Sequence, residues 1–186
     1  MASRTFLIRT PATTIGELDP LTWRNDDYLA TAAHIIPIFW PALFDKTNLV
    51  TREIRDENGE PFRYPVLLED AHTAVERAAR RARTIFEVLP ASYRELYQTF
   101  VNYVSRNAPQ RLYFEGLERW TTGTPAAYLA LLENCLAAFA PEATAGNWAV
   151  LLAQADISDL KDIEPYALAG SRWTRAVPWK STDDER

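Results

Sequence analysis

The 186-residue sequence contains few of the side chains on which most metal and redox sites depend. It has one cysteine, Cys135, and two histidines, His34 and His72. A single cysteine excludes an internal disulfide and any zinc site built from several thiolates. The histidines are far apart in the sequence, and neither belongs to the His-Glu-x-x-His pattern of a zinc-binding helix. We therefore expect no bound metal.

Glycine is also scarce, and its distribution excludes the common phosphate-binding loops. The six glycines are scattered along the chain, whereas a phosphate cradle needs closely spaced glycines so that backbone N–H groups can reach the oxygens. No serine stands in the Gly-x-Ser-x-Gly context of a nucleophile elbow. The sequence therefore predicts no cofactor and offers no recognisable catalytic motif.

No hydrophobic run is long enough to cross a membrane. The longest, residues 35–44, is about half the roughly 20 residues that a spanning helix needs, and Pro37 and Pro41 interrupt it. The first ten residues contain Arg4 and Arg9 and no apolar stretch of signal-peptide length. We expect a cytoplasmic protein that does not bind membranes.

Acidic residues outnumber basic ones, which argues against a nucleic-acid partner. The chain has 20 lysines and arginines against 25 aspartates and glutamates, a formal net charge of -5 and a pI near 5.1. A protein whose task is to neutralise phosphates would need the opposite balance. An acidic protein is better suited to a protein partner with a basic surface.

The sequence does contain ample apolar material for a core. Hydrophobic residues make up 47% of the chain, which is far from the composition of a disordered protein. We predict a single α+β domain over residues 1–186, mostly helical with a small, mainly antiparallel sheet. The acidic tail at about 181–186 should be mobile. Alternating and β-branched residues predict strands at 4–9, 48–55, 61–67 and 111–115, the middle two forming a hairpin.

Apolar residues at helical spacing predict the remaining elements. The clearest helix covers 69–89, and its arginines at 77, 80, 81 and 83 should form a solvated face. A helix over 126–139, capped by Thr124 and Pro125, is apolar nearly all round and should be central and buried. Ser92 and Glu95 match a capping box. Further helices are expected at 28–36, 38–44, 92–104, 148–154 and 159–163.

A catalytic site can still be assembled from groups that meet only in space. Cys135, His72 and an aspartate would form a nucleophilic triad. Cys135, however, lies among leucines on the apolar helix, where a thiol behaves as a small buried hydrophobe. An enzyme or ligand-binding module using His34 or His72 with nearby carboxylates is the alternative, although a structural or surface histidine is the simpler interpretation.

Two groups of carboxylates are candidates for partner binding. The first is Asp26 and Asp27, and the second consists of Asp156, Asp159, Asp162 and Glu164. Paired carboxylates can do acid–base chemistry or bind a hard cation, but neither group has calcium-loop spacing. Both coincide with predicted helix starts, where acids favour the positive end of the helix dipole. Exposed at such positions, they would be available to a basic partner.

The C-terminal segment carries two tryptophans, Trp173 and Trp179, beside Arg172, Arg175 and Lys180. Tryptophan with arginine is the composition of interface anchors, yet a tail docked on its own core would have the same sequence. Internal docking is the simpler hypothesis because a buried indole needs only one hydrogen-bond partner. Contact with a partner is the alternative.

Three segments together resemble a group of bacterial proteins. They are Arg4-Thr5-Phe6-Leu7, Ile36-Pro37-Ile38-Phe39-Trp40, and Leu168-Ala169-Gly170 followed by Trp173-x-Arg175-x-Val177-Pro178-Trp179. These segments look like those of small, acidic, uncharacterised proteins that are similar to toxin-immunity proteins. The resemblance covers under a fifth of the chain and carries no catalytic residue. It implies a cytosolic binding protein.

The leading hypothesis is therefore a non-enzymatic cytosolic protein that binds another protein. More specifically, it would be an immunity-type protein that neutralises its partner. The contact face of that partner should be basic. A small-molecule enzyme or ligand-binding module built on His34 or His72 is the alternative. A structural component of a larger assembly is the third hypothesis.

Deletion of residues 171–186 tests whether the tail docks on the core. If Trp173 and Trp179 do so, their removal strips two large apolar side chains, each worth on the order of 3 kcal/mol when fully buried. The melting temperature measured by circular dichroism should then fall clearly. An unchanged melting temperature would instead leave both indoles available to a partner.

Overall fold

The computed structural model describes residues 4–18, 23–55, 60–116 and 124–171. Within these ranges the chain forms a five-stranded antiparallel sheet and five α-helices. The strands are β1 (Arg4–Thr10), β2 (Tyr28–Ala33), β3 (Leu49–Arg55), β4 (Pro61–Asp70) and β5 (Arg111–Glu115). The helices are α1 (Ala71–Val88), α2 (Arg94–Asn107), α4 (Pro125–Ala137), α5 (Ala145–Gln154) and α6 (Pro165–Ala169). The α+β class is confirmed, whereas the expectation of a mostly helical chain gave too little weight to the sheet.

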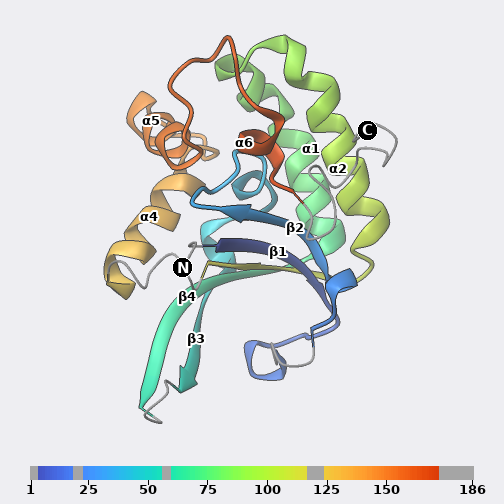
Figure 1. Cartoon of the computed structure of the whole chain (residues 1–186), viewed down its shortest axis with the longest axis vertical. Coiled ribbons are helices and arrows are strands. Elements are labelled where there is room, and N and C mark those ends of the chain that lie inside the picture. Colours follow the sequence, from blue (N-terminus) through green and yellow to red (C-terminus); the bar gives the residue numbers. More distant parts are fainter. Residues whose placement is uncertain (1–3, 19–22, 56–59, 117–123, 172–186) are drawn as a thin grey trace.

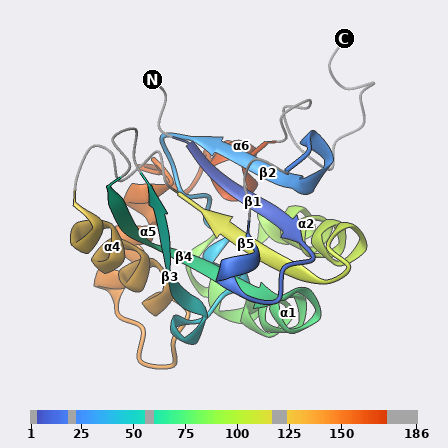
Figure 2. The same ribbon diagram turned by 90° about the horizontal axis from the view of Figure 1, so that it is seen from below.

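The sheet has the strand order β2-β1-β5-β4-β3, and every neighbouring pair is antiparallel. The helices α1 and α2 connect β4 to β5, which lies between β4 and β1. Figure 1 shows the helices on one side of the sheet, and Figure 2 shows the strands from below. On the other face, residues 12–18 and Trp23 contribute apolar side chains to a second, smaller core.

Strand β2 is the clearest departure from the predicted elements, because residues 28–36 were expected to form a helix. The alanines in this segment favour a helix locally. The segment instead pairs with β1, with Thr31 opposite Phe6, and most of its side chains are buried. As a strand it satisfies the backbone groups on one side of β1 and still contributes to the core. Tertiary pairing therefore overrides local propensity here.

Residues 38–44 are completely buried, as their apolar sequence suggests, but they do not form the expected α-helix. Only Pro41–Leu43 is helical, as a single 3-10 turn, η4. Proline has no N–H to give to a longer helix. Ile38 and Phe39 instead donate their N–H groups to carbonyls of α6, at 3.2 and 2.9 Å. The backbone of this segment is thus satisfied by a distant part of the chain.

Several other predictions are confirmed with shifted ends. The strands at 4–9 and 111–115, both strands of the hairpin, and the helix at 69–89 are present. Thr124 caps α4, since its hydroxyl accepts the Ala127 N–H at 3.2 Å. These elements carry strong local signals, either strict alternation or a capping residue before an apolar run.

Two predicted helix starts are wrong. No capping box forms at Ser92, because a 3-10 turn, η6 (Ala91–Tyr93), leads into α2. Residues 159–163 are irregular, with a turn only at Leu160 and Lys161, and the helix in this region is α6, which begins only at Pro165. Proline at the first helical position has a φ suited to that start.

Gly170 closes the core around Trp40, whose indole N–H donates to the Ala169 carbonyl at 2.8 Å. Gly170 has a φ of 76° and a ψ of -165°, a conformation that is essentially restricted to glycine. A Cβ at this position would lie 2.6 Å from the Trp40 ring and 2.8 Å from the Thr31 carbonyl oxygen. The glycine thereby brings Ser171 to β2, where it forms a bridge with Thr31.

Replacement of Gly170 by alanine should destabilise the protein. Backbone strain alone should lower the free energy of unfolding by roughly 1 to 3 kcal/mol, and displacement of the Trp40 ring should add to that loss. Urea denaturation followed by tryptophan fluorescence measures the change. The matched control is Gly16→Ala, since no atom lies within 4 Å of a Cβ there. Equal stability of the two variants would contradict the prediction.

Candidate protein-binding surface

One cluster of ionisable side chains is buried on the sheet face away from the helices. Arg52 on β3 and Glu115 on β5 are 5% and 4% exposed, and Nη1 of Arg52 lies 3.0 Å from a carboxylate oxygen of Glu115. Tyr64 donates its hydroxyl to the same carboxylate at 3.0 Å, and Tyr113 donates to it as well. None of these residues was predicted as a site. The available signal was the hairpin register, which places Arg52 opposite Tyr64.

This buried cluster holds the second core together. Arg52 donates to the Leu18 carbonyl at 3.4 Å, and its guanidinium lies 5.7 Å from the centre of the Trp23 ring. Burial, followed by the charge of Glu115, raises the pKa of both tyrosines, so they stay protonated and donate to the carboxylate. All four polar groups are thereby engaged with one another, which is typical of a structural network.

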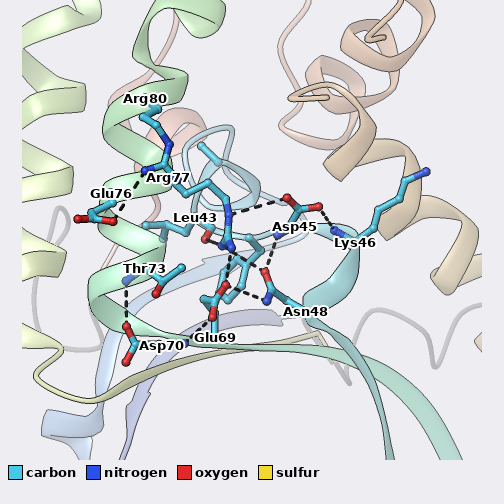
Figure 3. Close-up of polar contacts among 12 residues, drawn as sticks. Leu43, Asp45, Lys46, Asn48, Glu69, Asp70, Thr73, Glu76, Arg77 and Arg80 are labelled. Atoms are coloured by element: carbon cyan, nitrogen blue, oxygen red, sulfur yellow. Dashed lines mark hydrogen bonds and ion pairs between the residues drawn. The ribbon is translucent and has the colours of Figure 1, made fainter. Parts of the chain in front are cut away.

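A second cluster joins α1 to the buried segment 38–44 and to the loop that follows it. Figure 3 shows Arg77 pointing toward Glu69 and Asn48, and its Nη1 also donates to the Leu43 carbonyl at 2.8 Å. Arg81 donates to carbonyl groups of the buried segment itself, including those of Ala42 and Phe44. Burial lowers the pKa of Arg81 to about 10, which leaves it charged at pH 7.

The expectation that the arginines of α1 form one solvated face is therefore wrong for two of the four. The side chains of Arg77 and Arg81 are 14% and 13% exposed. Arg80 and Arg83 do lie on the solvated side, where they pair with glutamates four residues away. The two buried arginines bind the protein's own backbone, so they are engaged in the fold.

The first predicted partner-binding group, Asp26 and Asp27, lies in the 3-10 turn η3 (Asn25–Asp27) before β2. Asp26 is exposed, while Asp27 is half-buried and accepts the Arg24 N–H at 2.8 Å. Asp27 also lies 3.6 Å from Nε of Arg9. Both aspartates line a hollow of about 540 Å³ together with two arginines and one glutamate. With three acids and two arginines, the charge of this hollow is largely, though not completely, neutralised.

The second predicted group lies between α5 and α6, away from the first group (Figure 1). Its four members, Asp156, Asp159, Asp162 and Glu164, are all exposed. Asp159 and Asp162 were expected at a helix start, but they lie in an irregular connection, where Asp159 accepts the Lys161 N–H at 2.8 Å. The two predicted acidic groups thus do not form one surface. Trp173 and Trp179 lie outside the described residues.

The histidines and the cysteine lie in unrelated environments. His34 is exposed after β2, with a φ of 65°. His72 is exposed in the first turn of α1, 3.8 Å from Glu76, while Cys135 is completely buried. An exposed imidazole and a buried thiol do not form the imagined triad. Within the described ranges, no three histidine, cysteine or acidic side chains gather so as to hold a metal ion.

Helix α4 lies at the edge of the molecule and not, as predicted, at its centre (Figures 1 and 2). One side packs inward through Tyr128, Leu132, Cys135 and Leu136. The outer side exposes the apolar residues Ala126, Ala127, Leu129 and Ala130 in the first half of the helix, and the polar residues Glu133 and Asn134 in the second half. Leu129 is 38% exposed, and no other large hydrophobic residue of the described ranges is as exposed. An apolar helix face open to solvent is unusual in a helix that has no partner.

The helical region around α4 also carries the negative charge of the chain. We call residues 124–171, which comprise α4, α5, α6 and their connections, the α4–α6 layer. This layer has six acidic residues and one basic residue, Lys161, so the other 19 acidic and 19 basic residues of the chain balance. All six acids are exposed: Glu133, Glu142, Asp156, Asp159, Asp162 and Glu164. Exposed apolar and acidic side chains thus share one layer.

A groove of about 370 Å³ runs between α4 and the hairpin of β3 and β4. Its apolar lining includes Leu49, Pro65 and Leu129, and we call it the α4 groove. Lys46 lies at its rim, and Figure 3 shows this side chain pointing away from the cluster around Arg77. The groove therefore adds a concave feature to the exposed face of α4.

Comparison of the chain with protein-family models, with curated proteins and with solved structures finds no match. The resemblance to toxin-immunity proteins consequently stays a hypothesis. Among the described residues, no helix combines the length and apolar character needed to cross a membrane.

Replacement of Glu115 by glutamine should be strongly destabilising. The change leaves the Arg52 charge buried without its counter-charge, which costs about 3 to 5 kcal/mol of unfolding free energy in comparable buried pairs. Denaturation in urea measures it. The matched control is Arg63→Met, which removes an exposed ion pair with Glu53 at 2.7 Å and should cost no more than about 1 kcal/mol. Similar losses in both variants would contradict a structural role for the buried cluster.

Proposed function

We propose that this protein is a non-enzymatic, cytoplasmic binding protein whose α4–α6 layer receives the basic face of a partner protein. The observation that carries the proposal is the coincidence of two features in that layer. It holds an apolar helix whose outer side is open to solvent, and it holds six exposed acids against one lysine. Apolar contacts supply the binding energy, while charge selects the partner and directs its approach.

The proposal favours the second acidic group over the first. Asp156, Asp159, Asp162 and Glu164 share the layer with the exposed face of α4. The Asp26 and Asp27 group is partly neutralised by neighbouring arginines. We therefore assign partner binding to Asp156, Asp159, Asp162 and Glu164. The resemblance to toxin-immunity proteins adds the more specific proposal that binding neutralises the partner.

Affinity purification of the tagged protein from its native host, followed by mass spectrometry, tests the proposal. A stoichiometric protein partner with a basic surface supports it. Capture of an acidic partner, or turnover of a small metabolite that depends on His72, would overturn it. The captured partner, once purified, provides the material for measuring association rates.

Reversal of charge at Asp159→Lys and Asp162→Lys should slow association with that partner by about tenfold at low salt, because steering depends on the sign of the surface charge. Surface plasmon resonance at two salt concentrations measures the on-rate. The protein should stay folded, since both side chains are exposed and lie outside helices and strands.

The control for this prediction is the double variant Asp26→Lys and Glu95→Lys, which makes the same change in net charge at exposed positions outside the layer. It should affect the on-rate much less. Equal slowing by the two double variants would mean that net charge alone, and not the α4–α6 layer, attracts the partner.

A further inference from the structure

The last described residue, Ser171, lies beside β2 at one edge of the sheet. Its N–H donates to the Thr31 carbonyl at 2.7 Å, and the Thr31 N–H donates to its carbonyl in return. Such an exchange is a hydrogen-bonded pair of an antiparallel ladder. An extended chain that follows Ser171 is therefore directed along the edge of β2, toward Tyr28 at the start of that strand. Residues 172–186 are that chain, and they lie outside the described ranges.

The register of β1 and β2 shows which side chains lie level with the next positions of the chain. Phe6 lies opposite Thr31, and Ile8 lies opposite Tyr28, because a bulge gives β2 one extra residue. Phe6 and Ile8 are two positions apart, so two extended residues cover the distance from Thr31 to Tyr28. The second residue after Ser171 therefore reaches the level of Tyr28.

Alternation assigns a face of the sheet to each of these positions. Directly opposite residues of an antiparallel pair point to the same face. Thr31 is opposite Phe6, whose ring packs against the second core, on the face away from the helices. Ser171 shares that face as the partner of Thr31. In an extended chain, Trp173 and Arg175 then point to it as well.

The path along β2 ends at the hollow of about 540 Å³. Thr10 of β1 lines this hollow, together with Asp26 and Asp27 in the turn before β2. The fourth residue after Ser171, which is Arg175, is level with Thr10 by the same count. The hollow has three acids against two arginines, so it lacks one cation for neutrality. Asp26 is exposed and, among the described residues, forms no ion pair.

We infer that the C-terminal segment continues along the edge of β2, packs Trp173 against Tyr28 and places Arg175 in the hollow, where it pairs with Asp26. The surface at this edge thus binds the chain's own segment 172–175. Charge complementarity supports this occupant, because one arginine neutralises the remaining acid of the hollow. The inference goes beyond the proposed function, since it involves neither the exposed acids of the α4–α6 layer nor the α4 groove.

Side chains hold the segment after the first backbone pair. The extra residue of the bulge, Leu29, accepts the Tyr103 hydroxyl at its carbonyl, at 3.2 Å, so the regular ladder stops at the bulge. Tyr28 is half-buried, and its ring lies 5.3 and 6.2 Å from the rings of Phe6 and Trp23. An indole beside this group adds aromatic contacts of the same kind. The aromatic contact and the ion pair thus take the place of further backbone pairing.

Carbodiimide coupling of the 186-residue chain tests the inference, because the reagent joins a carboxylate to a lysine amine without a spacer. The variant Arg175→Lys keeps the charge and supplies the amine. Mass spectrometry of the digested protein should find the introduced lysine joined to Asp26 or Asp27. The matched control is Thr174→Lys, whose side chain starts on the opposite face and should couple to these two aspartates at least about fivefold less.

A further variant, Trp173→Ser combined with Arg175→Lys, removes the aromatic contact. It should lower the yield of the same product by about tenfold, since the effective concentration of the amine at the hollow falls. A melting curve measured in parallel shows that each variant is folded. Coupling to the acids of the α4–α6 layer as readily as to Asp26 and Asp27 would overturn the inference. Equal yields from Arg175→Lys and Thr174→Lys, an unchanged yield without Trp173, or no product at all would overturn it as well.

Discussion

The buried segment at residues 35–44 is the constraint on which the rest of the structure depends. It lies inside the protein with almost no regular secondary structure, so each of its backbone polar groups needs a partner from elsewhere. Arg77 and Arg81 of α1 donate hydrogen bonds to carbonyl groups of this segment. Its N–H groups at Ile36, Ile38 and Phe39 donate to carbonyls of α5 and α6. One segment thereby fixes α1, α5 and α6 relative to the sheet. The α4–α6 layer owes its fixed position to these contacts.

The predictions from sequence succeeded where the signal is local. Strict alternation located β1, β-branched residues located the hairpin, and Thr124 located the start of α4, because each of these signals is local in the sequence. The predictions failed at β2, because its alanines favour a helix locally, whereas pairing with β1 favours a strand. They also failed for Arg77 and Arg81, which look solvated on a helical wheel. Their partners are backbone carbonyls of a loop whose path no local pattern reveals.

The candidate surface was predicted only in part. Exposure of Asp156, Asp159, Asp162 and Glu164 followed from their polar setting, and the structure agrees. The contribution of α4 was missed, because a helix that is apolar all round was taken for a central one. Its outer face is open instead. The sequence of α4 is apolar although part of the helix is exposed. Natural proteins tend to keep such a local inconsistency at functional surfaces.

Charge and burial are distributed in a way that separates stability from binding in this protein. The ionisable groups best suited to chemistry, around Arg52 and Glu115, are enclosed and fully engaged with one another. The hollow at Asp26 and Asp27 combines three acids with two arginines, so its charge is largely neutralised. Unbalanced charge and uncovered apolar surface occur together in the α4–α6 layer, next to the edge strand β3. An enclosed polar network favours a rigid scaffold, and an acidic, apolar, concave surface favours a macromolecular ligand over a small substrate. That division of charge and burial supports the proposed binding function.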